Sequence, residues 1–282
     1  MSLLEKFGLR RTSPTRQLID GFTFFNELDL LEIRLKYLYD TVDQFVLVEA
    51  TTTHTGLPKP LYFEENKARF AWAMDKITHI VEELPAEDQV PEGADGPWLR
   101  ENQQRNAIAK GLEGANADAL VLIGDLDEIP DRDTLAKSHH ITTPHKLRQL
   151  YSYYYVNNFC YKRRRRLRHW SAAVLLPLNT LNTPQEVREA SLLTKEYPTL
   201  NNGGWHFSYL GGKQAILEKL NSFAHTECNT DAIRSETNIE KALDAGHDIF
   251  SRDQYHFRRV EMTRFPVALR ELLSQYPHII KP

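Results

Sequence analysis

Two carboxylates separated by one residue, Asp125 and Asp127, follow an apolar run at residues 119–123. The length and flanks of this run are typical of a strand buried on both faces, and Pro130 ends it. Residues two apart in an extended backbone point the same way, so we expect both carboxylates on one side. Such oxygens are preferred ligands of Mg²⁺ or Mn²⁺, which takes its other ligands from water and substrate phosphates. The pair predicts a divalent-cation site beyond a strand end, where ligands collect in open α/β sheets.

The alternative is that Asp125 and Asp127 only solvate the strand end, while Asp131 or Asp133 caps the next helix. His206 lies in an aromatic segment that paired glycines flank, and glycine lets a backbone approach a ligand closely. A lone histidine is often a core residue, but beside a cation it would be a third ligand or a phosphate contact. We therefore predict a metal-binding set of Asp125, Asp127 and His206.

The segments before this motif alternate between strand and helix patterns. We predict strands at 22–25, 44–49 and 77–81 and helices at 28–39, 66–74 and 98–112. Asn26 is a predicted N-cap, with Asp29 three residues later. Glu101 and Arg105 are spaced to pair across one helical turn, so Arg105 is either a pairing partner or a phosphate or nucleotide contact. This order predicts an α/β fold with a parallel sheet.

The texture changes after Pro130. Aromatic residues crowd 149–159, another strand pattern covers 170–176, and a basic run at 162–168 lies between them, which suggests a hairpin. The run, including Arg163 to Arg166, is either a solvated tip or a contact for an anionic acceptor, a lipid headgroup or a diphosphate. Helix patterns follow at 213–223, 236–245 and 266–274.

Composition limits the classes of protein. The chain has 282 residues, 41% hydrophobic and 26% charged, with a formal net charge of -3. These values are ordinary for a soluble globular protein and do not suggest one that coats nucleic acid. Two cysteines form no disulfide framework. The sequence has no secretory h-region and no apolar run long enough to cross a bilayer, so we predict a cytoplasmic protein without a transmembrane segment. Peripheral contact with the inner membrane face stays an open alternative. We predict an arm at 1–19 and one domain at 20–282.

Four blocks of the sequence together resemble glycosyltransferase family 17: residues 25–34, residues 43–49, Asp125-Leu126-Asp127-Glu128-Ile129-Pro130, and Gly204-Trp205-His206-Phe207-Ser208. The resemblance implies a GT-A-like (Rossmann-like) fold: a mostly parallel central sheet with flanking helices, to which we add an aromatic-rich β-hairpin region and C-terminal helices. It implies a nucleotide-sugar-binding half at 20–135 and an acceptor-side half at 136–282. It also implies inversion at the anomeric carbon of a UDP-sugar, with UDP-GlcNAc as the expected donor.

By this resemblance, Asp125 and Asp127 would hold Mn²⁺ or Mg²⁺ on the donor diphosphate. The predicted donor-binding residues are Asn26, Glu49, Arg100, Arg105, Asp125 and Lys213. An inverting transfer needs a base near the acceptor hydroxyl, and the candidates are Glu227 and Glu128, each of which could instead support a neighbour or cap a helix. The expected acceptor is a glycan or a lipid-linked glycan.

Two alternatives are weighed against this function. One is a sugar-nucleotide or glycan-binding protein without turnover, which would keep the same fold. The other is a haloacid-dehalogenase-type phosphotransferase, which also carries Asp-x-Asp after a parallel strand. That class usually has Thr or Val at the position of Ile129 and carries the motif near the start of the chain, so it is disfavoured here.

Overall fold

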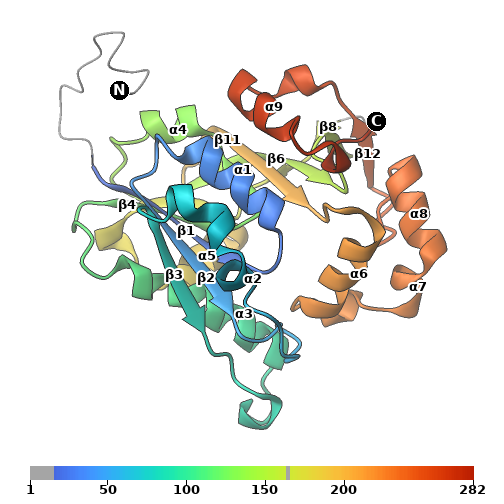
Figure 1. The fold of residues 1–282 in the computed structure, drawn as a ribbon, viewed down its shortest axis with the longest axis horizontal. Helices are drawn as coiled ribbons and strands as arrows, with labels where there is room; N and C mark the ends of the chain where they lie inside the picture. Colours follow the sequence, from blue (N-terminus) through green and yellow to red (C-terminus); the bar gives the residue numbers. More distant parts are fainter. Residues whose placement is uncertain (1–15, 163–165) are drawn as a thin grey trace.

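The computed structural model describes residues 16–162 and 166–282. Within these residues, one twelve-stranded sheet is flanked by helices (Figure 1). The strands are β1 Leu18–Phe24, β2 Gln44–Ala50, β3 Ile77–Glu82, β4 Leu120–Asp125, β5 Glu128–Pro130, β6 His145–Tyr153, β7 Asn158–Lys162, β8 Arg166–Leu167, β9 His169–Trp170, β10 Val174–Pro177, β11 Thr199–Ser208 and β12 Tyr255–Arg259. The helices are α1 Leu28–Leu38, α2 Tyr62–Glu65, α3 Gly96–Asn106, α4 Arg132–Lys137, α5 Pro184–Leu193, α6 Gly212–Ser222, α7 Asp231–Arg234, α8 Glu236–Ala245 and α9 Val267–Leu273.

The strand order is β12-β7-β6-β10-β4-β1-β2-β3, with β11 paired to β5 and β6. The four strands β3, β2, β1 and β4 are parallel. From β10 onward the pairs are antiparallel, apart from β11 beside β6. The sheet is therefore mixed: the predicted parallel pairing holds for β3, β2, β1 and β4 but not for most of the strands beyond β4. A short connection explains one antiparallel pair: only residues 154–157 join β6 to β7, and a parallel neighbour needs a crossover of about a dozen residues or more.

The predicted strands of the first half correspond to β1, β2 and β3, and the buried strand before Asp125 is β4, whose packing follows the strand period of two. Leu120 and Leu122 of β4 belong to the hydrophobic core that includes residues of α1 and α9. Val121 and Ile123 belong to the core on the other face, with residues of the 3-10 segment Ala107–Leu112 and of α5. The strand is therefore buried on both faces, as predicted. Residues 66–74, predicted to be helical, form the 3-10 segment Lys67–Ala73.

The second half differs in detail from its predicted layout. Residues 149–159 cover parts of two strands, β6 and β7, separated by a turn in which Tyr154 has a φ of 70°. The strands that flank the basic run are β7 and β8, which are antiparallel, while Arg163, Arg164 and Arg165 lie outside the described residues. The predicted strand at 170–176 is divided between β9 and β10. The last three predicted helices correspond to α6, α8 and α9.

The start of α1 corrects another prediction. Its N-cap is Glu27, without a capping side-chain hydrogen bond, and Asn26 instead donates from Nδ2 to Glu218 at 3.1 Å. The pattern failed because a tertiary partner from α6 engages the Asn26 amide. The first strand begins at Leu18, two residues before the predicted domain boundary.

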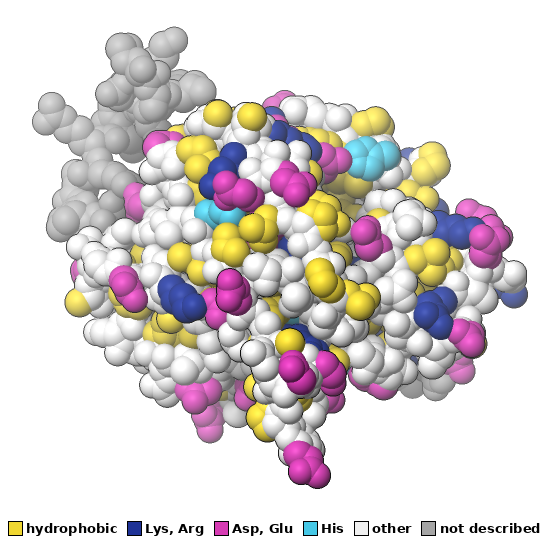
Figure 2. All heavy atoms as spheres, turned by 60° about the horizontal axis from the view of Figure 1, so that its bottom comes forward, with side chains coloured by type: hydrophobic (Ala, Val, Ile, Leu, Met, Phe, Trp, Pro, Cys, Tyr) yellow, Lys and Arg dark blue, Asp and Glu magenta, His cyan; other side chains and the backbone are white. Residues whose placement is uncertain are grey.

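The described surface is mixed in charge. Figure 2 shows acidic and basic side chains interspersed over one face, as the formal net charge of -3 leads us to expect. In residues 16–162 and 166–282, no helix is long and apolar enough to cross a membrane.

Candidate functional site

A cavity of about 800 Å³ lies at the carboxyl ends of the parallel strands. Thr23 and Phe24 line it from the end of β1, Asp125 from the end of β4, and His54 from the loop after β2. Side chains of α3, α5, α6, β6 and β11 also line it, so both predicted halves of the chain contribute. This is the sheet edge at which the sequence predicted a ligand.

Arg34 of α1 anchors the acidic turn, the name used here for residues 125–128 between β4 and β5. Its Nη1 donates to the backbone carbonyls of Asp125 at 2.9 Å and of Leu126 and Glu128 at 3.0 Å. Its remaining nitrogens bind the carboxylate of Asp20 on β1, and both side chains are fully buried. A buried charge needs such a partner, so the pair anchors the turn that carries both predicted metal ligands.

Asp125 is held by two arginines. Arg105 Nη2 lies 3.1 Å from Oδ1, and Arg188 of α5 binds Oδ2. Thr23 also donates to Oδ1 at 3.1 Å. Burial opposes ionisation of this carboxyl, but Arg188 and then Arg105 outweigh it and hold the pKa of Asp125 well below its usual range. Asp125 is therefore a carboxylate at neutral pH.

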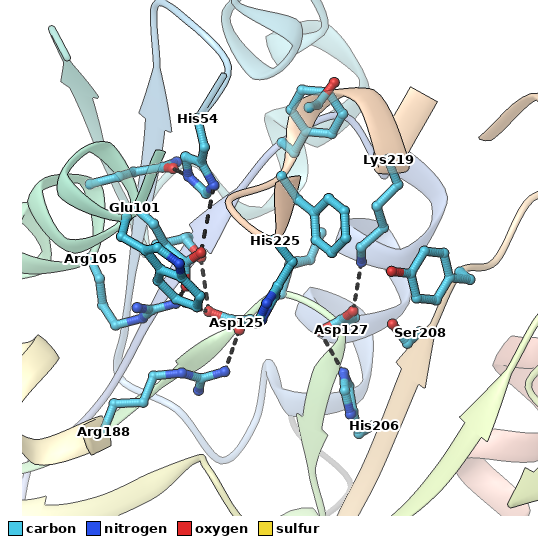
Figure 3. A pocket seen from close by; sticks show the side chains of 18 of the residues that line it. His54, Glu101, Arg105, Asp125, Asp127, Arg188, His206, Ser208, Lys219 and His225 are labelled. Carbon is cyan, nitrogen blue, oxygen red and sulfur yellow. Dashed lines mark hydrogen bonds and ion pairs between the residues drawn. The ribbon is translucent and has the colours of Figure 1, made fainter. Parts of the chain in front are cut away.

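Asp127 has a different pair of partners, shown in Figure 3 on opposite sides of its carboxylate. Lys219 Nζ of α6 lies 3.0 Å from Oδ2, and His206 Nε2 of β11 lies 3.3 Å from Oδ1. Burial is again outweighed, by Lys219 first and His206 second, so the pKa of Asp127 is well below its usual range. The structure thus brings together the three predicted metal ligands around one cavity, with added cationic side chains.

Glu128, a predicted base, is buried and does not line the cavity. Its side chain is fully buried and accepts hydrogen bonds from Arg188, from Trp170 Nε1 and from the backbone N–H of Asp125 at 2.9 Å. Through these bonds, Glu128 helps to orient Arg188 and the acidic turn. The other predicted base, Glu227, is an exposed residue whose Oε1 lies 2.7 Å from Nδ1 of His225, a side chain that lines the cavity.

Aromatic rings form part of the cavity wall. Tyr151 is stacked with Trp170, with centroids 5.8 Å apart, and with His206 at 5.0 Å. Trp98 meets His225 edge to face at 4.7 Å. Flat apolar faces beside a few charged groups are typical of small-molecule sites.

The predicted donor-binding residues are dispersed. Arg105 and Asp125 line the cavity. Glu49 is buried behind it, where it contacts Lys59 Nζ at 3.4 Å and His79 Nε2 at 3.2 Å. None of the other three lines this cavity, although all lie in the described part of the chain: Arg100 donates to the carbonyl of Pro85 and to Glu87, Asn26 donates to Glu218, and Lys213 pairs with Glu236. Their donor-binding roles stay predictions.

Sequence reasoning missed Arg188, Lys219 and His54. His54 Nδ1 lies 3.8 Å from Glu101, which in turn binds Arg105 at 2.8 Å. No motif marks Arg188 or Lys219, because α5 and α6 bring them to the site from 63 and 92 positions along the chain from the aspartates they bind. His54 lies in the loop after β2. The one available signal is general: two buried carboxylates need cationic partners.

The donor chemistry of the turn fits a hard divalent cation, because Asp125 and Asp127 present ionised oxygens to the cavity and His206 adds an imidazole nitrogen. In the described residues, however, no group of three or more His, Cys, Asp or Glu side chains is arranged to hold a metal ion. Lys219 and the two arginines contact the same oxygens. Metal binding therefore stays a proposal and requires a change of partners at Asp127.

Comparison with known proteins gives the class. The family model described as glycosyltransferase family 17 matches residues 2–268, so the chain belongs to that family. The chain is also similar to beta-1,4-mannosyl-glycoprotein 4-beta-N-acetylglucosaminyltransferase of Rattus norvegicus and of Homo sapiens, at 30% identity over 125 residues in each case. The aligned segment covers 42% of this chain and 22% of each relative, about a fifth of their length.

Proposed function

We propose that this protein is an inverting glycosyltransferase that moves N-acetylglucosamine from UDP-GlcNAc to a glycan or lipid-linked glycan. Family membership supports glycosyl transfer, and the names of the relatives support the sugar. The observation that carries the proposal is the pair of ionised aspartates, Asp125 and Asp127, facing a cavity of about 800 Å³ at the carboxyl edge of the parallel strands.

The chemistry needs charge stabilisation at the leaving group. The acceptor oxygen attacks the anomeric carbon, and the bond from that carbon to the diphosphate breaks with its electron pair going to UDP. Arg105, Arg188 and Lys219 line the cavity and are suited to neutralise that charge. A divalent cation held by Asp125 and Asp127 would add Lewis-acid stabilisation of the same diphosphate.

A base must remove the proton of the acceptor hydroxyl. Glu227 and Glu128 remain the predicted candidates. At Glu227, burial opposes ionisation but the hydrogen bond from His225 outweighs it, so the pKa of Glu227 lies below its usual range. Because His225 lines the cavity, Glu227 can also act through that imidazole.

Titration calorimetry and UDP-release assays test the proposal. We expect UDP-GlcNAc to bind in the presence of Mn²⁺ and to release UDP slowly to water, and EDTA to weaken binding. Asp127→Asn should lower UDP release by about 100-fold or more, the scale on which losing one charge-stabilising group acts. Asp133→Asn is the matched control, because Asp133 lies in α4 and its nearest cationic partner is Arg132 at 3.9 Å.

Two results would count against the proposal. A wild-type protein that binds no nucleotide sugar would remove its basis. Binding without hydrolysis, and without transfer to any acceptor in a glycan panel, would favour the sugar-nucleotide-binding alternative.

A further inference from the structure

Lys219 is the most exchangeable of the cations at the acidic turn. Its Nζ lies 3.0 Å from Asp127 and 3.8 Å from Glu27, and its side chain is 26% exposed, compared with 8% for Arg188 and 3% for Arg105. The Lys219 ammonium group therefore lies on the cavity wall beside two carboxylates.

The arginines are fixed by several partners each. Arg188 binds Asp125 with one nitrogen and Glu128 with two, and Arg105 binds Glu101, Asp125 and Gln185. A planar guanidinium held at several points cannot leave one carboxylate without losing the others. The ammonium group of Lys219, by contrast, lies at the end of a flexible four-carbon side chain. Among the described residues, Asp127 is the one hydrogen-bond partner of its Nζ within 3.5 Å.

The ammonium occupies the oxygen that a divalent cation would use. Figure 3 shows Lys219 and His206 approaching Asp127 from opposite sides. Each contacts a different oxygen of the carboxylate. A cation arriving alone must displace Lys219 from Asp127 and leave it with only the more distant Glu27 carboxylate, 3.8 Å from Nζ. A cation arriving with a diphosphate offers Lys219 a new anionic partner, to which ammonium groups bind well.

We propose that Lys219 is a displaceable counter-ion: it neutralises Asp127 in the free protein and transfers to the donor diphosphate when nucleotide and divalent cation bind. This inference rests on the proposed function and assigns Lys219 to the donor site. Its consequence is that cation and nucleotide each strengthen binding of the other, by the same factor for both. Lys219 thereby weakens binding of the cation when no nucleotide is present.

Replacing Lys219 tests this directly. The affinity of Mn²⁺ is measured from the electron paramagnetic resonance signal of the free ion, with and without UDP. Lys219→Met should bind Mn²⁺ alone about tenfold more tightly than wild type, and UDP should then strengthen Mn²⁺ binding about tenfold less. Lys219→Arg, which keeps a positive charge, should retain weak Mn²⁺ binding. Lys67→Met is the control, because Lys67 pairs with Glu64 at 2.5 Å and does not line the cavity.

The outcomes separate this inference from the proposed function. Calorimetry of UDP-GlcNAc with the wild-type protein tests the proposed function by itself. If the nucleotide sugar binds but Lys219→Met shows the Mn²⁺ affinity and UDP coupling of wild type, the exchange is wrong and the proposed function stands. Weaker Mn²⁺ binding by Lys219→Met would also overturn the exchange. Circular dichroism melting of each variant verifies that the compared proteins are folded.

Discussion

Arg34 shows how one residue can fix a site without facing it. Its guanidinium satisfies three carbonyls of the acidic turn, and its charge is balanced by Asp20 in the neighbouring strand. Backbone carbonyls at a buried turn need donors, and Arg34 supplies them with a rigid fork. The orientation of Asp125 and Asp127 therefore depends on a side chain of α1.

Arg34→Met should lower the free energy of unfolding by about 3 to 5 kcal/mol, because it leaves the buried Asp20 carboxylate without its partner. Denaturant unfolding followed by circular dichroism measures this change. Lys36→Met in the same helix is the control, since its pair with Glu32 is partly exposed and spans one turn. That pair contributes about 0.5 kcal/mol or less. Equal losses in the two variants would mean that Arg34 does not anchor the turn.

At the scale of elements, β11 fixes the turn from its other side. It pairs with β5, placing His206 opposite Glu128, and the N–H of Phe207 donates to the carbonyl of Asp127 at 2.8 Å. Gly204 permits this approach. Its φ is 119°, and a Cβ there would lie 2.2 Å from the carbonyl oxygen of Ile129. A side chain at this position would push the two strands apart.

Gly204→Ala should lower the free energy of unfolding by about 2 to 4 kcal/mol, combining overpacking of about 1 to 3 kcal/mol with about 1 kcal/mol for the left-handed backbone. It should also weaken UDP-GlcNAc binding, because the turn moves away from His206. Gly93→Ala separates the two effects: its φ is 78° with no atom within 4 Å of an added Cβ, so it should cost about 1 kcal/mol. Thermal melts and calorimetry measure both, and equal destabilisation of the two variants would refute the steric argument.

At the scale of the whole molecule, local patterns predicted what depends on local physics. The buried strand before Asp125 has a hydrophobic run and clear boundaries, so its position and the sheet edge beyond it were predictable. The mixed sheet was not, because the antiparallel placement of β10 beside β4 depends on pairing between distant segments. The same limit applies to Arg188 and Lys219. Their helices carry no motif, and the two side chains reach the aspartates only because of how the fold places these helices.

The most direct test of the central claim is anomalous diffraction from crystals grown with UDP-GlcNAc and Mn²⁺. We predict a manganese peak bound to a carboxylate oxygen of Asp127 at about 2.1 Å, the distance expected for a small hard divalent cation. The diphosphate should lie in the same cavity, with Lys219 turned toward it. A nucleotide sugar bound away from Asp125 and Asp127, or a manganese peak elsewhere on the molecule, would contradict the claim that this acidic turn binds the donor.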